Sequence, residues 1–274
     1  MIADWDDAYA NAAHIPGGAG FAARLAVASA AWRAGFDAAR FRTLAHGPDP
    51  REIVELFLPE ETPRGILVFV HGGFWRAFGP ADWSHLAAGG LARGWAVAMV
   101  GYRLAPAVRI AEITASITRA VDAVALEVGG PIVLSGHSAG GHLVVRLICD
   151  DGALPAHVLA RVARLVPISG LFDLRPLMRT AMNADLRLDL AEARAESPAL
   201  REAIAGAPPV HVWVGGDERP EFVRQSALFA NVWIGLGVET RLTIEPGRHH
   251  YDVIEGLAEA GSPLMAAILG EQGG

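Results

Sequence analysis

The chain has 274 residues and 52% of them are hydrophobic, so it can bury a substantial core and is not a disordered polypeptide. Its 23 basic and 30 acidic residues give a net charge of −7, and no basic stripe is visible, so nucleic acid is not an expected partner. Every residue counted as Lys+Arg is an arginine, which excludes lysine chemistry such as a Schiff base.

The cellular setting is predicted from what the sequence lacks. One cysteine, Cys149, cannot form an intramolecular disulfide, and its apolar surroundings favour a buried structural thiol. The acidic N-terminus does not look like a signal peptide, and no apolar run approaches the roughly 18 residues of a membrane span. We therefore expect a cytoplasmic protein with no membrane partner, and a homodimer is left open.

Strand-like and helix-like segments alternate along most of the chain. Strands are expected where short apolar or β-rich runs occur, at 51–58, 66–70, 95–102, 132–134, 164–168, 211–214 and 240–244, and those at 66–70 and 95–102 are expected to be buried. Helices are expected at 21–36, 82–93, 110–128, 143–149, 222–233 and 252–269. In the helix at 110–128, isoleucines and valines recur at steps of three and four residues, which is typical of a helix that packs on a sheet.

This alternation predicts an α/β fold, with a mostly parallel central sheet covered by helices on both faces. It pauses at 171–209, where proline-punctuated helical pieces indicate a small cap-like insertion above the sheet. No internal repeat or linker is visible, so residues 1–274 are expected to form one domain. Ligands in such sheets bind at the carboxyl ends of the strands.

The stretch Gly136-His-Ser-Ala-Gly140 lies where a strand ends and a helix begins. This is the Gly-x-Ser-x-Gly pattern of a nucleophile elbow in its required context. The two glycines lack the Cβ atoms that would collide with the neighbouring strand and helix, and the helix N-terminus favours developing negative charge. The pattern predicts that Ser138 is a nucleophile for acyl transfer.

A serine hydroxyl needs a base and an orienting acid, which in this architecture follow in the order Ser, Asp or Glu, His. For the acid, Asp217 is favoured because it lies immediately beyond a strand and after Gly215-Gly216, which permits a sharp turn. Asp173, after the preceding strand, is the second choice, and Glu218 is a weaker third.

The base is expected in the loop after the last strand, which contains His249 and His250. Two adjacent histidines on a loop cannot face the serine in the same way, and His250 is preferred because it lies nearer the final helix. A metal site at this pair is disfavoured, since no second cluster of ligands has suitable spacing.

The oxyanion hole requires two backbone N–H donors. One is expected from Ala139, the residue after the nucleophile. The other is expected from the loop His71-Gly-Gly-Phe-Trp75, in which Gly72, Gly73 and Phe74 are the candidates. His71 itself is expected to pin this loop.

Several motifs together make the chain resemble the kynurenine formamidase (arylformamidase) branch of the α/β hydrolases. They are His71-Gly-Gly-Phe-Trp, Gly136-His-Ser-Ala-Gly-Gly-His, Ser169-Gly-Leu-Phe-Asp-Leu-Arg-Pro, Pro220-Glu-Phe-Val-Arg-Gln-Ser226 and His250-Tyr-Asp-Val-Ile254. The resemblance implies an α/β-hydrolase fold, the triad Ser138, Asp217 and His250, and hydrolysis of N-formyl-kynurenine or a similar aryl formamide without a metal or cofactor.

Such a small-molecule substrate would place its formyl group beside the nucleophile and its ring among aromatic side chains, for which Phe74, Trp75, Phe172 and Tyr251 are the candidates. Arg76 or Arg175 could receive a substrate carboxylate. Two alternatives remain open: a carboxylesterase for small acyl esters that uses the same triad, and a non-catalytic receptor for a small hydrophobic ligand.

Overall fold

The computed structural model describes residues 2–270, and at its centre is a sheet of eight strands in the order β1-β2-β4-β3-β5-β6-β7-β8. From β3 onward all neighbouring strands are parallel, whereas β2 pairs antiparallel with both β1 and β4. The strand bounds are β1 Phe41–Ala45, β2 Ile53–Phe57, β3 Ile66–Val70, β4 Ala96–Val100, β5 Ile132–His137, β6 Val162–Ile168, β7 Val210–Gly215 and β8 Thr240–Glu245. The predicted α/β-hydrolase class is confirmed.

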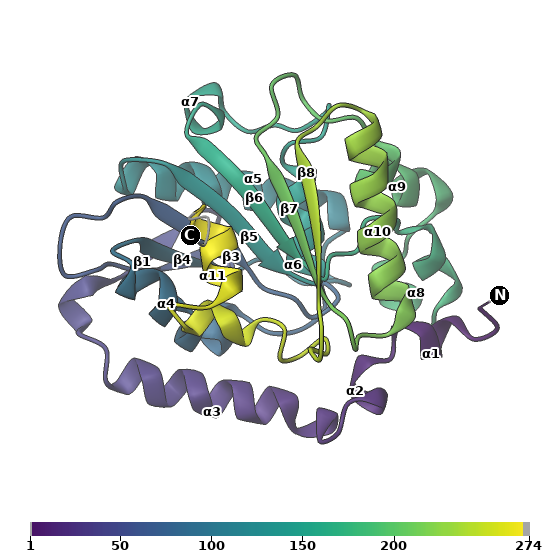
Figure 1. Ribbon diagram of the computed structural model, residues 1–274, viewed down its shortest axis with the longest axis horizontal. Coiled ribbons are helices and arrows are strands. Elements are labelled where there is room, and N and C mark those ends of the chain that lie inside the picture. Colours follow the sequence, from purple (N-terminus) through teal and green to yellow (C-terminus); the bar gives the residue numbers. More distant parts are fainter. Residues whose placement is uncertain (1, 271–274) are drawn as a thin grey trace.

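Helices cover both faces of the sheet, as Figure 1 shows. The α-helices are α1 Trp5–Tyr9, α2 Asn11–His14, α3 Phe21–Ala34, α4 Ala87–Ala92, α5 Ile110–Glu127, α6 Ala139–Arg146, α7 Ala156–Leu159, α8 Asn183–Leu186, α9 Leu190–Ala195, α10 Pro220–Gly235 and α11 Pro263–Leu269. Short 3₁₀ helices span Gly18–Gly20, Ala38–Arg40, Pro80–Leu86, Arg175–Arg179, Pro198–Leu200 and Glu255–Ala258.

The strands face two separate cores because their side chains alternate between the two faces of the sheet. On β3, Ile66, Val68 and Val70 pack into the core that includes α5, α6 and α10, whereas Leu67 and Phe69 pack into the core that includes Trp83 and α11. All five of these side chains are buried. Burial on both faces explains the continuous apolar runs by which the strands were predicted.

The sequence missed one strand and overextended one helix. Strand β1 lies at the edge of the sheet and is largely exposed, so it carries no apolar run. The helix expected at 252–269 is broken, and α11 begins only at Pro263. Proline disfavours a helical conformation in the residue before it, and Ser262 instead accepts a hydrogen bond from the backbone N–H of Met265 at 2.9 Å.

The segment between β6 and β7 contains only short helical pieces, which agrees with the interruption expected at 171–209. It is fastened to the rest of the chain through Arg146 of α6, whose guanidinium bonds both carboxylate oxygens of Glu196 at 3.1 and 3.2 Å. Both side chains are buried. The assignment of the whole chain to one domain stays a prediction. Within residues 2–270, no helix is both long and apolar enough to cross a bilayer.

Candidate active site

Ser138 occupies the turn between the end of β5 and the start of α6. Its backbone has φ 55° and ψ −116°, a strained conformation for a residue with a side chain. The turn is compact because Gly140 touches β3: a Cβ atom there would lie 1.9 Å from the carbonyl oxygen of Val70. Only glycine fits at that position, and the resulting elbow holds the serine at the carboxyl end of the central strands.

The loop after β3 passes directly beside this serine. A Cβ atom at Gly72 would lie 3.1 Å from the Cβ of Ser138. Gly73 and Phe74 follow with φ values of 108° and 49°, so both adopt left-handed backbone conformations. Ala139, the other predicted donor, is the first residue of α6, where backbone N–H groups have no partner within the helix. The residues predicted to surround an oxyanion therefore gather around Ser138.

His71 pins the base of this loop, as expected from the sequence. The Tyr102 hydroxyl donates to the carbonyl of His71 at 2.9 Å, and the two rings stack with centroids 4.3 Å apart. Complete burial lowers the pKa of His71 to about 4, so the ring is neutral near pH 7. Its position and protonation state suit a structural role.

The structure corrects the predicted acid. Glu218, and not Asp217, contacts His250: the Glu218 Oε2 lies 2.6 Å from the Nδ1 of His250. Both of these side chains are buried, whereas Asp217 is exposed to solvent. A buried carboxylate at this distance fixes the histidine ring with Nδ1 as the donor, so that Nε2 is free to act as an acceptor.

Glu218 turns inward because two other groups bind its second oxygen. The backbone N–H of Gly215 donates to Oε1 at 2.8 Å, and the hydroxyl of Ser169 donates to the same atom. Gly215 also permits close contact with the histidine loop, since a Cβ atom there would lie 2.2 Å from the carbonyl oxygen of Arg248. Sequence reasoning missed Ser169, although it directly follows β6 and opens one of the motifs singled out above.

The second-choice acid, Asp173, lies in a different environment. Its carboxylate accepts hydrogen bonds from the Arg175 side chain at 2.9 and 2.8 Å. The bonds and charge of Arg175 keep the pKa of Asp173 below its usual range, although burial opposes this. Asp173 and Arg175 line a separate surface hollow with Trp5, so neither belongs to the site around Ser138.

The preference for His250 over His249 agrees with the geometry. His250 is 3% exposed and bonds Glu218, whereas the Nδ1 of His249 accepts from the backbone N–H groups of Tyr251 and Asp252 at 3.2 and 3.1 Å. The Nε2 of His137 donates to the carbonyl of His250 at 2.9 Å, which fixes the loop from the other side. Burial, followed by the neighbouring His250, lowers the pKa of His137 well below its usual value.

Ser138 and His250 line one cavity of about 320 Å³. Its wall combines five aromatic side chains of Phe, Trp and Tyr with several polar ones. Besides Ser138 and His250, the lining consists of Asn11, Phe21, Gly73, Phe74, Arg76, Ala77, Phe78, Trp83, His137 and Tyr251. Phe21 and Tyr251 stack with centroids 4.0 Å apart and planes at 10°, so the start of α3 is joined to the residue beside His250.

Two of the predicted substrate contacts are wrong. Trp75 is fully buried, with its ring edge-on to His142 at 5.1 Å, and Phe172 is fully buried and stacked on Phe229 at 4.3 Å. Both pack in the core beneath the site and do not line its cavity. An aromatic residue near a catalytic motif can either pack in the core or contact a ligand, and full burial assigns these two residues to the core.

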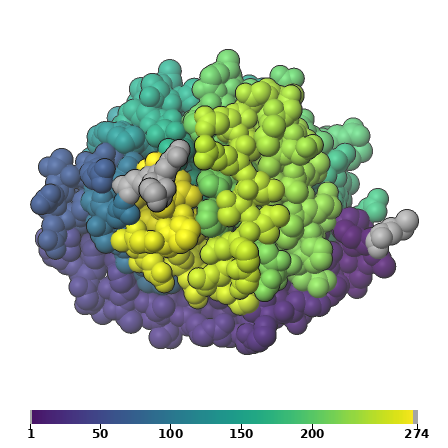
Figure 2. All heavy atoms as spheres, in the orientation of Figure 1, coloured from purple at the N-terminus to yellow at the C-terminus, as the bar shows by residue number. Residues whose placement is uncertain are grey.

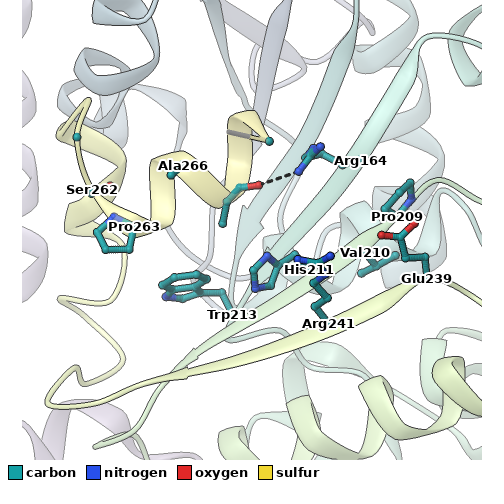
Figure 3. A pocket seen from close by; sticks show the side chains of 13 residues that line it. Arg164, Pro209, Val210, His211, Trp213, Glu239, Arg241, Ser262, Pro263 and Ala266 are labelled. Carbon is teal, nitrogen blue, oxygen red and sulfur yellow. Dashed lines mark hydrogen bonds between the residues drawn. The ribbon is translucent and has the colours of Figure 1, made fainter. Parts of the chain in front are cut away.

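A larger hollow of about 660 Å³ lies elsewhere, at the amino ends of β6, β7 and β8 beside α11 (Figure 3). Arg164, His211, Glu239 and Arg241 contribute polar side chains to its wall. Arg164 donates to the carbonyl of Ala267 at 3.3 Å. Ligand sites in parallel sheets form at the opposite, carboxyl ends of the strands. The candidate active site is therefore the smaller cavity.

Cys149 is fully buried, and burial raises the pKa of its thiol to about 11, as expected of a structural residue. Within residues 2–270, no three or more His, Cys, Asp or Glu side chains are grouped so that they could hold a metal ion.

The chain belongs to the α/β-hydrolase family, since the family model with that fold matches residues 67–252. The sheet order and the serine elbow described above are consistent with that assignment, and the protein is a hydrolase.

Among individual proteins, the chain is similar to the kynurenine formamidase of Drosophila melanogaster, with 27% identity over 75% of this chain and 73% of the relative. It is also similar to a solved structure called a "putative thioesterase" from Silicibacter sp. TM1040, with 47% identity, a TM-score of 0.91, and coverage of 97% and 99% of the two chains. Esterase 2 of Thermogutta terrifontis with bound propionate has 21% identity, a TM-score of 0.67, and coverage of 86% and 97%, and so shares the fold.

Proposed function

We propose that the protein is a serine hydrolase that cleaves an aryl formamide, such as N-formyl-kynurenine, into an aromatic amine and formate. The observation that carries this proposal is the cavity of about 320 Å³, in which Ser138 and His250 are surrounded by five aromatic side chains. Its volume is near the lower end of the range for small-molecule sites and suits one aromatic ring. The similarity to kynurenine formamidases supports the same substrate class.

In the first half of the reaction, the Ser138 oxygen attacks the formyl carbon, and the Nε2 of His250 takes the hydroxyl proton. Glu218, bonded to Nδ1, stabilises the imidazolium that forms. Backbone N–H groups of Ala139 and of the Gly72–Phe74 loop hold the oxyanion; one such donor typically contributes about 3–4 kcal/mol in the transition state.

In the second half, the C–N bond breaks while His250 returns the proton to the departing aromatic amine, which leaves a formyl ester on Ser138. Water then attacks this ester with His250 as the base, and formate is released. A formyl group is the smallest acyl unit, so little space is needed beside Ser138, and the aromatic wall receives the ring of the leaving amine.

Hydrolysis of an ester or thioester by the same residues is the second candidate. The similarity to the Silicibacter structure called a "putative thioesterase", at 47% identity, favours this alternative. Its acyl–enzyme chemistry would be the same, and the difference would lie in the leaving group.

The two candidates are separated by measuring kcat/KM for N-formyl-kynurenine, p-nitrophenyl acetate and a short acyl thioester, with wild type and Ser138→Ala side by side. We expect formamide turnover that disappears in Ser138→Ala. Strong ester or thioester turnover without formamide turnover would refute the proposal, and equal activities of Ser138→Ala and wild type on every substrate would refute catalysis by this serine.

A further inference from the structure

Asn11 is a buried polar residue that the proposed reaction leaves unused. It is the first residue of α2, is only 5% exposed, and lines the same cavity as Ser138 and His250. The N-cap of α2 is Ala10, so Asn11 is not the capping residue, and among residues 2–270 its buried Oδ1 has no hydrogen-bond partner. The side chain therefore carries an unused acceptor beside the reacting groups.

The segment that carries Asn11 is held firmly on both sides. Before it, the Tyr9 hydroxyl donates to Glu221 of α10 at 2.8 Å, and Asp7 pairs with Arg219. After it, the Nε2 of His14 lies 2.6 Å from Asp7. Figure 1 shows α1 beside the lower end of α10, and Figure 2 shows the N-terminal part of the chain, in purple, along the lower edge of the molecule. The position of Asn11 is therefore fixed by its neighbours and not by its own side chain.

A buried amide oxygen without a donor is unfavourable, because it has lost its bonds to water and gained none in return. Such a group calls for an explanation, and a partner supplied by a bound molecule is one explanation for a group that lines a cavity. The surrounding wall includes five aromatic side chains, and Arg76, which lines the same cavity, bonds Asp185 of the insertion at 2.9 Å. Asn11 thus offers an amide oxygen as an acceptor beside these aromatic side chains, and the Nδ1 of His137 is a second buried atom of this wall without a partner among residues 2–270.

We propose that the Oδ1 of Asn11 accepts a hydrogen bond from an amino group carried by the aromatic leaving group, and so selects amino-bearing aryl substrates. A protonated amine is the strongest donor of this kind. The inference rests on the proposed function, because it assigns the leaving group of that reaction to this cavity. Asn11 acts on substrate choice and takes no part in proton transfer.

The test compares substrates that differ only in this amino group. One pair is N-formyl-kynurenine and its analogue without the α-amino group. The second pair is the corresponding aryl acetates, in which an acetate ester replaces the formamide. The readout is the ratio of kcat/KM for the amino-bearing substrate to kcat/KM for its amino-free partner.

In Asn11→Ala, we expect this ratio to fall about 10- to 100-fold, mainly through KM of the amino-bearing substrate. Asn11→Asp retains an acceptor and should keep the ratio near or above that of wild type. Asn231→Ala removes an exposed asparagine from α10 and serves as the matched control. Thermal unfolding of each variant shows whether it is folded.

A ratio within about twofold of wild type in folded Asn11→Ala would overturn the inference, as would an equal fall in Asn11→Asp. Equal losses on both members of a pair would assign Asn11 a structural role and also overturn it. The ester pair keeps the two proposals distinguishable: if wild type hydrolyses no formamide but Asn11→Ala lowers the ester ratio, the proposed substrate fails and the role of Asn11 stands.

Discussion

The two ends of the parallel sheet differ in what their loops bring together. At the carboxyl end, the residues after β5, β7 and β8 supply Ser138, Glu218 and His250, and the residue after β6 supports Glu218. At the amino end, a hollow of about 660 Å³ is larger than the candidate active-site cavity of about 320 Å³. Its His211 lies 2.8 Å from the hydroxyl of Thr243, and the hydroxyl of its Ser262 bonds backbone groups of Gly256 and Met265, so these two side chains are engaged elsewhere and not with each other. The volume of a cavity therefore does not by itself identify a catalytic site. The better indicator is that several strands end at the cavity and place chemically matched side chains there.

The largest expected effect is at the carboxyl end. Ser138→Ala removes the attacking oxygen and should lower kcat by at least about 10⁴-fold. Steady-state kinetics on the best formamide or ester substrate measures the loss, and circular dichroism confirms that the variant is folded. Activity within tenfold of wild type would mean that another group performs the attack.

Glu218 and Asp217 provide a sharper comparison within the same turn. Glu218→Gln should lower kcat by about 10³- to 10⁴-fold, because the amide cannot stabilise the imidazolium of His250. Asp217→Asn changes an exposed side chain and should leave kcat within about twofold of wild type. If Asp217→Asn lowered kcat more than Glu218→Gln did under the same conditions, Asp217 and not Glu218 would be the acid.

Acid stability should depend on the buried histidines near the elbow. Burial lowers the pKa of both His71 and His142 to about 4, whereas the unfolded chain protonates them near 6.5. Between these values only the unfolded state gains the protons, so stability is fully present above about pH 6.5 and falls as the pH drops towards 4, by about 3 kcal/mol for each histidine.

Urea unfolding at several pH values between 7 and 4 measures this loss. His142→Gln should flatten the dependence, whereas His211→Gln at the amino-end hollow should flatten it less, because His211 is only partly buried. If the free energy of unfolding of wild type did not change over this range, the buried histidines would have to be protonated in the folded state.

The smallest effect is expected at the amino end. Arg241→Ala in the hollow should leave kcat/KM within about twofold of wild type, since the residue lies at the other end of the sheet from Ser138. Kinetics on the same substrates test this. A tenfold loss of kcat/KM in a folded variant would show that the amino end of the sheet influences catalysis. The proposed difference between the two ends would then be wrong.

The central part of the fold was predictable because its signals are local. Strands buried on both faces have continuous apolar runs, and the elbow at Ser138 needs glycines at fixed positions, as the contact between Gly140 and Val70 shows. Strand β1 was missed because an exposed edge strand needs no such run. His250 could be chosen from its place before the final helical region.

The acid could not be chosen in this way. Asp217 and Glu218 are neighbours in one short turn, and their sequence context is almost the same. Glu218 faces inward because Ser169 bonds its carboxylate and because Gly215 lies in close contact with Arg248. Ser169 and Arg248 are both distant in sequence from this turn. The burial of Trp75 and Phe172 likewise depends on tertiary packing that no local pattern specifies.

The N-terminal segment has a consequence for how these enzymes diversify. The family match begins at residue 67, yet Asn11 and Phe21, which lie before it, line the candidate active-site cavity together with Ser138 and His250. The reacting groups and part of the binding wall thus lie on separable stretches of sequence. Mutations or recombination confined to the first stretch could change which molecules enter without disturbing the catalytic machinery, so chimaeras that exchange this stretch between relatives offer a direct route to new selectivity.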